Sequence, residues 1–169
     1  MQKKIAEIAF ISNETKRVWI GDPCYVIPDE LWDSVCDQTF KGEREVGFKI
    51  EFTFEQLSEE NLPHEFIQNC QGKNASELVF LQCGTAYGDG VFDSNSGFEY
   101  DVDSGCLAII PDYLVDSQKD TDLGHWFEIT RPGEKSNKIA LVTDGAGEFR
   151  FYISDDIIET IFTGDESDS

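Results

Sequence analysis

Short apolar segments separated by turn-forming residues run through most of this chain, and their length restricts the fold more than any other feature. The clearest is residues 46–54, where Val, Phe and Ile alternate with Gly, Lys, Glu and Thr. Strict alternation is typical of a strand with one face in the core, and it does not fit a helix. Similar segments predict strands at residues 5–11, 17–20, 24–27, 78–83, 91–92, 98–102, 106–110, 126–130, 138–143 and 148–153.

Three other segments predict short helices. The first begins at Pro28 and the second covers residues 63–70, before Gly72. The third follows a Ser154 cap and has acidic residues in its first turn. The expected apolar faces are Leu31, Trp32, Val35 and Cys36 in the first helix, and Ile157, Ile158, Ile161 and Phe162 in the third.

The predicted fold class is therefore α+β and mostly β. We expect a twisted antiparallel sheet, open or curled into a sandwich or partial barrel, with two or three short helices. A length of 169 residues fits one domain with a substantial core. Residues 1–163 are expected to form this single globular domain, and residues 164–169 an acidic disordered tail without an apolar anchor.

The charge is strongly unbalanced, with 34 acidic against 13 basic side chains and a formal net charge of −21. Such a field repels phosphate backbones, so we expect no direct binding to nucleic acid. It attracts basic proteins and divalent cations, although solubility alone is an alternative explanation. The sequence shows no membrane span and no signal-peptide core, so a cytoplasmic protein is expected.

The residues for nucleophilic or metal chemistry are few. Five cysteines stand at irregular spacing, which argues against both a disulfide framework and a zinc knuckle. The two histidines, His64 and His125, favour structural roles, although a pair of a cysteine with His125 remains an alternative. No phosphate-binding loop or serine-hydrolase motif is present, and the sequence does not indicate an enzyme.

Three aspartates stand beside glycine or proline at the ends of apolar segments: Asp22, Asp89 and Asp103. Turns of this kind bring side chains to one edge of a sheet, and Tyr25 and Tyr87 lie close to them in sequence. We therefore expect these five residues to form a ligand-binding site, with a divalent cation as the one cofactor that such a site suggests. The alternative is that each aspartate only bonds its own turn.

Two segments carry a resemblance to known proteins. Residues 21–26 read Gly-Asp-Pro-Cys-Tyr-Val, and residues 87–92 read Tyr-Gly-Asp-Gly-Val-Phe, followed by Val-Asp-Ser-Gly-Cys-Leu at residues 102–107. Together they resemble a family of small uncharacterised proteins found in bacteria and their phages. The resemblance implies a biological setting, in which a phage product would act as an early inhibitor or host-modifying factor. It implies no catalytic residues.

Two functional hypotheses follow. The first is an acidic binding protein that engages a basic protein surface, where spaced carboxylates imitate the phosphates of a nucleic acid. The second is a small-ligand or metal-binding protein, or a metal-assisted hydrolase, with its site at Asp22, Asp89 and Asp103. A mimic spreads its acids over a convex face, whereas a site collects them in a concavity. The sequence does not indicate the oligomeric state.

Overall fold

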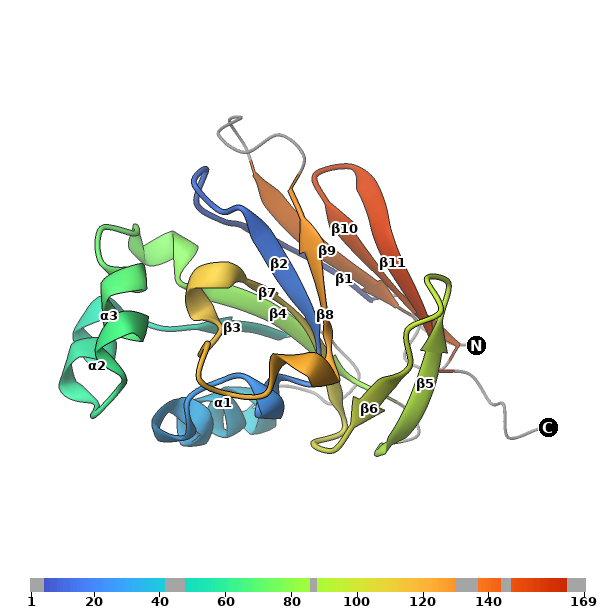
Figure 1. Ribbon diagram of the computed structural model, residues 1–169, viewed down its shortest axis with the longest axis horizontal. Coiled ribbons are helices and arrows are strands. Elements are labelled where there is room, and N and C mark those ends of the chain that lie inside the picture. Colours follow the sequence, from blue (N-terminus) through green and yellow to red (C-terminus); the bar gives the residue numbers. More distant parts are fainter. Residues whose placement is uncertain (1–4, 42–47, 86–87, 130–136, 144–146, 164–169) are drawn as a thin grey trace.

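The computed structural model describes residues 5–41, 48–85, 88–129, 137–143 and 147–163. Within these ranges the strands form two antiparallel sheets (Figure 1). The first sheet has the order β1-β9-β10-β11-β5-β6 and the second the order β3-β4-β7-β2-β8. The strands are β1 (Ile5–Phe10), β2 (Arg17–Gly21), β3 (Phe48–Glu51), β4 (Val79–Gly84), β5 (Gly90–Ser94), β6 (Tyr100–Val102), β7 (Cys106–Pro111), β8 (His125–Glu128), β9 (Lys138–Thr143), β10 (Glu148–Ile153) and β11 (Asp156–Phe162).

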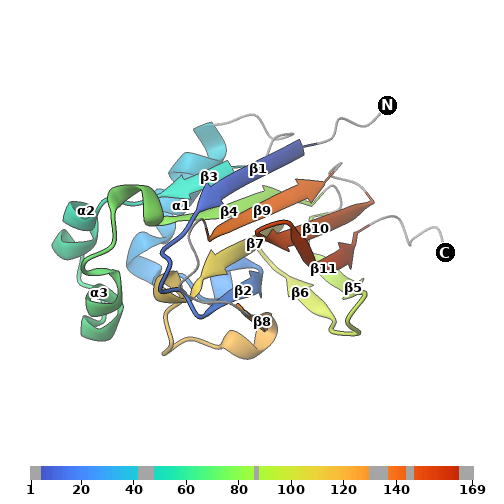
Figure 2. The same ribbon diagram turned by 90° about the horizontal axis from the view of Figure 1, so that it is seen from above.

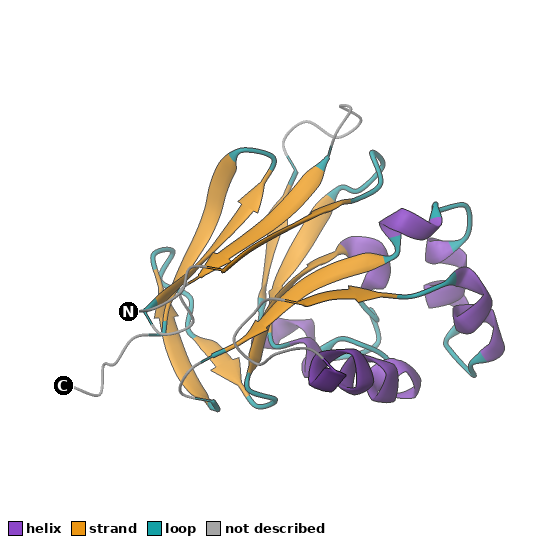
Figure 3. Cartoon of the chain, turned by 180° about the vertical axis from the view of Figure 1, so that it is seen from behind, coloured by secondary structure: helices purple, strands orange, loops and turns teal. Residues whose placement is uncertain are grey.

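The helices lie on one side of the second sheet, away from the first (Figure 3). Three α-helices are described: α1 (Asp29–Lys41), α2 (Phe54–Glu59) and α3 (His64–Cys70). Four short 3-10 helices connect the strands: η1 (Pro23–Tyr25), η2 (Ala75–Glu77), η3 (Asp112–Leu114) and η4 (Thr121–Leu123). The molecule is therefore layered as sheet, sheet and helices. Among the described residues, no helix is long and apolar enough to cross a membrane.

One hydrophobic core lies between the two sheets. Figure 2 shows the strands of these sheets from above. Leu141 and Phe149 enter it from the first sheet, and Leu81, Leu107 and Ile109 enter it from the second. All five side chains are fully buried. Burying each such side chain stabilises the fold by about 1.5–3 kcal/mol relative to leaving it in water.

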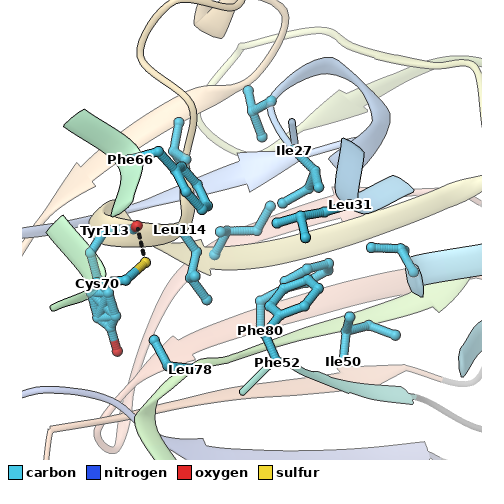
Figure 4. Close-up of a cluster of buried hydrophobic side chains, with 14 of the residues drawn as sticks. Ile27, Leu31, Ile50, Phe52, Phe66, Cys70, Leu78, Phe80, Tyr113 and Leu114 are labelled. Atoms are coloured by element: carbon cyan, nitrogen blue, oxygen red, sulfur yellow. Dashed lines mark hydrogen bonds between the residues drawn. The ribbon is translucent and has the colours of Figure 1, made fainter. Parts of the chain in front are cut away.

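A second core joins the opposite face of the second sheet to the helices (Figure 4). Phe80 and Ile110 point into it from the sheet, and Leu31, Leu57 and Phe66 point into it from α1, α2 and α3. Strand β7 contributes alternate residues to both cores: Leu107 and Ile109 to the first, and Ala108 and Ile110 to the second. The second sheet is therefore covered on both sides.

The structure confirms the α+β, mostly β class. In the described part of the chain, the strands form two facing sheets and do not close into a barrel. The predicted helices at Pro28 and at residues 63–70 are present as α1 and α3. The predicted strands at residues 5–11, 17–20, 78–83, 106–110, 126–130, 138–143 and 148–153 correspond to β1, β2, β4, β7, β8, β9 and β10.

The predicted C-terminal helix is wrong, because residues 156–162 form strand β11 in the first sheet. The pairing with β10 shifts between Phe151 and Tyr152, which face Glu159 and Ile157. Ile158 is the extra residue of a β-bulge, so the apolar residues no longer follow a period of two. Ser154 is not a helix cap but a turn residue with a φ of 55°.

Two further segments differ from the prediction. Residues 46–47 of the expected strand at residues 46–54 lie outside the described residues; β3 covers Phe48–Glu51, and Phe54 begins helix α2. The Thr53 hydroxyl caps this helix by accepting from the Gln56 N–H at 3.0 Å, a Thr-x-x-Gln signal that the alternating pattern conceals. The expected strand at residues 24–27 is replaced by η1, because Asp22 caps a turn that has Pro23 at its first position.

The strands around residues 91–102 also have other limits. Strand β5 continues through Ser94, and β6 begins only at Tyr100, where a strand from residue 98 was expected. Two other predicted features lie outside the described residues: Tyr87 and the tail at residues 164–169.

Candidate functional site

Asp22 follows strand β2 and is completely buried. Its carboxylate accepts four hydrogen bonds. One oxygen accepts from the Cys24 N–H at 2.9 Å and the Ser104 hydroxyl at 2.7 Å. The other accepts from the N–H groups of Asp103 and Ser104, both at 2.6 Å. Charge-assisted bonds of this length are among the stronger ones in proteins. Asp22 thus connects η1 to the turn between β6 and β7, 81 residues away.

Two of the three predicted aspartates, Asp22 and Asp103, lie in contact. Asp22 takes part through its carboxylate, and Asp103 takes part through its backbone N–H. Asp103 contributes its N–H to Asp22, while its own side chain is exposed. Asp89 is also exposed and lies just before β5. Its turn borders the turn of Asp103, because the Thr85 N–H donates to the Gly105 carbonyl at 2.8 Å. The exposed carboxylates therefore belong to neighbouring turns, and the buried one is engaged internally.

Tyr25 is half-buried at the end of η1. Burial, the adjacent Cys24, and the charges of Asp22 and Asp103 raise the pKa of its hydroxyl to about 12. Burial and the charge of Asp22 also raise the pKa of the Cys106 thiol to about 12. Both groups are protonated at neutral pH, so neither is an activated nucleophile there.

The five cysteines are free thiols in the structure. His125 lies between aromatic rings, with ring centroids 5.1 Å from Phe98 and 4.6 Å from Phe127. Its Nδ1 is buried and has no hydrogen-bond partner in the structure. Within the described ranges, no three His, Cys, Asp or Glu side chains are grouped closely enough to hold a metal ion.

Exposed carboxylates follow the outer surfaces of the helices, and we call this surface the acidic helical face. On α1 they stand at Asp29, Asp33 and Asp37, one turn apart. In the described part of residues 22–72, Lys49 is the only cation whose side chain is placed. The face consists of Asp29, Glu30, Asp33, Asp37, Glu55, Glu59, Glu60 and Glu65.

A hollow of about 510 Å³ opens in the acidic helical face between α1, α3 and residues 116–119. Asp29, Glu65 and Asp116 are among its lining residues. The Lys119 ammonium binds here, donating to the Asp29 carboxylate at 2.6 Å and to the Ile27 carbonyl at 3.1 Å. The hollow therefore already holds one cation of the chain itself. One signal for these acidic surroundings is visible in the sequence, namely the absence of basic residues between Arg17 and Lys41.

Together these features define an α+β protein of two facing sheets with an acidic helical layer. Comparisons with known proteins add no family to this description. No family model matches the chain, no curated protein sequence matches it, and no solved structure resembles it closely enough to count as a match.

Proposed function

We propose that this is a binding protein whose acidic helical face engages a basic surface of another protein. The observation that carries the proposal is the arrangement of eight exposed carboxylates over the helices, of which Asp29 is paired with Lys119. Such a face attracts cationic surfaces and accelerates their association. It also suits a partner that normally holds nucleic acid.

The spacing of the α1 carboxylates supports mimicry of a phosphate backbone. Asp29, Asp33 and Asp37 are four residues apart, which places successive carboxylates about 6 Å apart along the helix axis. Two steps along one strand of duplex DNA cover about 7 Å. A protein that binds phosphates with alternate lysines or arginines would meet carboxylates at a comparable interval.

The hollow at Lys119 supports the proposal independently of the charge count. Its walls hold an ammonium group with a carboxylate and a carbonyl. Asp29 is already paired with Lys119, so a partner lysine or arginine would pair with the other exposed carboxylates of the lining, Glu30 and Glu65. The resemblance to a bacterial and phage family gives this binding a setting, in which the protein acts as an inhibitor of a host protein.

Neutralising one part of the face tests the proposal. The variant carries Glu30→Gln, Asp33→Asn and Asp37→Asn, which keep the shape of α1 and remove three charges. The measurement is fluorescence anisotropy of a labelled arginine-rich decapeptide. Each exposed charge pair contributes about 0.2–1 kcal/mol, so we expect affinity to fall about tenfold.

A matched variant separates position from net charge. Asp93→Asn, Glu99→Gln and Asp156→Asn remove three exposed carboxylates from the strand-rich end of the molecule. We expect this variant to bind the peptide nearly as well as the wild type. Equal losses in the two variants would mean that only the total charge matters, and the acidity would then serve solubility.

A further inference from the structure

Three cations gather at one place outside the acidic helical face. Lys16, Arg17 and Lys73 line a hollow of about 820 Å³, together with the aromatic residues Tyr113 and Trp126. The hollow lies on the helix side of the second sheet, at its β8 edge, because Trp126 in β8 is paired with the core residue Trp19. In a chain with 13 basic against 34 acidic side chains, such a grouping needs an explanation.

Arg17 forms no ion pair with the described residues, although Glu128 stands opposite it on β8. Its guanidinium carbon lies 3.7 Å from the centroid of the Trp126 ring. Trp126 pairs with Trp19, so Arg17 and Trp126 are diagonal neighbours on one face of the β2–β8 pair. Among the residues that the structure describes, no carboxylate lies within 4.0 Å of the Arg17 side-chain nitrogens. A guanidinium stacked on a ring keeps its N–H groups free for a planar or tetrahedral anion.

The second cation is largely buried. The Lys73 side chain is 15% exposed, with its ammonium 4.9 Å from the centroid of the Tyr113 ring and 3.8 Å from the Glu14 carboxylate. Glu14 is 85% exposed, so this ion pair is open to competition from a ligand. The Asp112 carboxylate accepts from the backbone N–H groups of Lys16 and Arg17, at 3.1 and 3.4 Å, and positions both residues.

We propose that this hollow binds a small molecule through a phosphate or carboxylate group held by Arg17 and assisted by Lys16 and Lys73. The hollow is open to solvent, and its volume of about 820 Å³ leaves room for a small molecule. A long polyanion does not fit, because Glu14, Glu65 and Asp112 also line the hollow and Glu65 continues into the acidic helical face. Glu65 belongs to both this hollow and the acidic helical face, but the three cations that carry this proposal do not belong to that face, so the failure of one proposal leaves the other standing.

The indole N–H resonance of Trp126 reports on the hollow, since the ring contacts Arg17 directly. A Trp126→Phe variant assigns this resonance among those of the three tryptophans. Inorganic phosphate and acetate are titrated separately, and the anion with the stronger saturable shift identifies the preferred group. We expect dissociation constants on the order of millimolar for such fragments.

Three variants decide the outcome. Arg17→Gln should weaken binding at least tenfold, and Arg17→Lys should weaken it as well, because a lysine lacks the stacked planar fork. Lys49→Gln removes an exposed cation outside the hollow and should leave the affinity unchanged. Glu14→Gln frees Lys73 and should tighten binding severalfold.

The proposal is overturned if neither anion produces a saturable shift of the Trp126 resonance. It is also overturned if folded Arg17→Gln and Arg17→Lys, checked by thermal unfolding, bind as well as the wild type. Tighter binding by Glu14→Gln is a result that a purely structural role for Arg17 would not produce.

Discussion

At the scale of single residues, two completely buried carboxylates stand out, Asp22 and Glu159. Asp22 has donors on both oxygens. Glu159 accepts on one oxygen only, from the hydroxyls of Ser96 at 2.8 Å and Tyr100 at 2.7 Å, and its other oxygen has no partner in the structure. Burial and the bond to Glu159 raise the pKa of the Tyr100 hydroxyl well above its ordinary value. Asp22 is therefore the better satisfied group.

We predict that Asp22→Asn destabilises the protein by about 3 kcal/mol, measured as the free energy of unfolding in urea. The amide nitrogen of asparagine replaces an oxygen that accepts two hydrogen bonds. Because this nitrogen is itself a donor, the two groups that donated to the oxygen lose their acceptor. Either the pair from Asp103 and Ser104 or the pair from Cys24 and Ser104 loses its acceptor.

Asp103→Asn is the matched control, because Asp103 contributes only its backbone N–H to this contact and its side chain is exposed. Its effect should stay within about 0.5 kcal/mol. If Asp22→Asn were as stable as the wild type, the carboxylate would not hold the two turns together, and a ligand-binding role for Asp22 would regain support.

The sequence identified Asp22 as a special turn residue, because an acid between glycine and proline is visible locally. It could not show that the same carboxylate also holds the Asp103–Ser104 turn, since that contact spans 81 residues. The cations Arg17 and Lys73 were missed for the same reason. They are 56 positions apart in the chain, and only the packing of α3 and η3 against the sheet brings them to one hollow.

At the scale of elements, the spacing of apolar residues correctly predicted most strands. It failed where the same residues fit both the period of a helix and the period of a strand. Ile157, Ile158 and Ile161 have a helical spacing, yet the β-bulge at Ile158 accounts for the same order in a strand. Likewise Phe52 continues the alternation of β3, although the chain already turns at Thr53 to begin α2. Pairing with β10 makes residues 156–162 a strand, and the Thr53 cap makes the chain after it a helix.

The turn between β10 and β11 gives a prediction at this scale. Ile153 pairs with Asp156, so Ser154 and Asp155 form a two-residue loop, and Ser154 has the only positive φ among the described non-glycine residues. We predict that Ser154→Gly raises the free energy of unfolding by about 0.5–1 kcal/mol, because glycine adopts this conformation without steric cost. Ser154→Ala, which keeps the Cβ atom, should not stabilise. A loss of stability in the glycine variant would contradict the β10–β11 turn.

At the scale of the whole molecule, charge is segregated. The acidic helical face gathers exposed carboxylates on α1, α2 and α3, while Lys16, Arg17 and Lys73 meet at the β8 edge of the second sheet. Composition revealed the excess of acid but not this division, which depends on how the helices cover one side of the sheet. Because of this division, one molecule presents an acidic surface that attracts cations and a second surface where three cations attract anions.

Repulsion within the acidic helical face should make stability depend on salt. On α1, like charges stand at Asp29–Asp33, Asp33–Asp37 and Glu30–Asp33, and each pair costs about 0.2–0.5 kcal/mol at low ionic strength. Raising sodium chloride from 0.1 to 1 M shortens the screening distance from about 10 Å to about 3 Å. Removing about 1 kcal/mol of repulsion should raise the melting temperature by about 2–4 °C.

The variant with Glu30→Gln, Asp33→Asn and Asp37→Asn separates this repulsion from general effects of salt, because it lacks all three like-charge pairs. Its melting temperature should start higher at 0.1 M salt and should rise less between the two salt concentrations. The ion pair of Lys119 with Asp29 remains in both proteins, so its screening cancels in the comparison. An equal rise in both proteins would show that the salt acts elsewhere and that the carboxylates of α1 do not repel one another measurably.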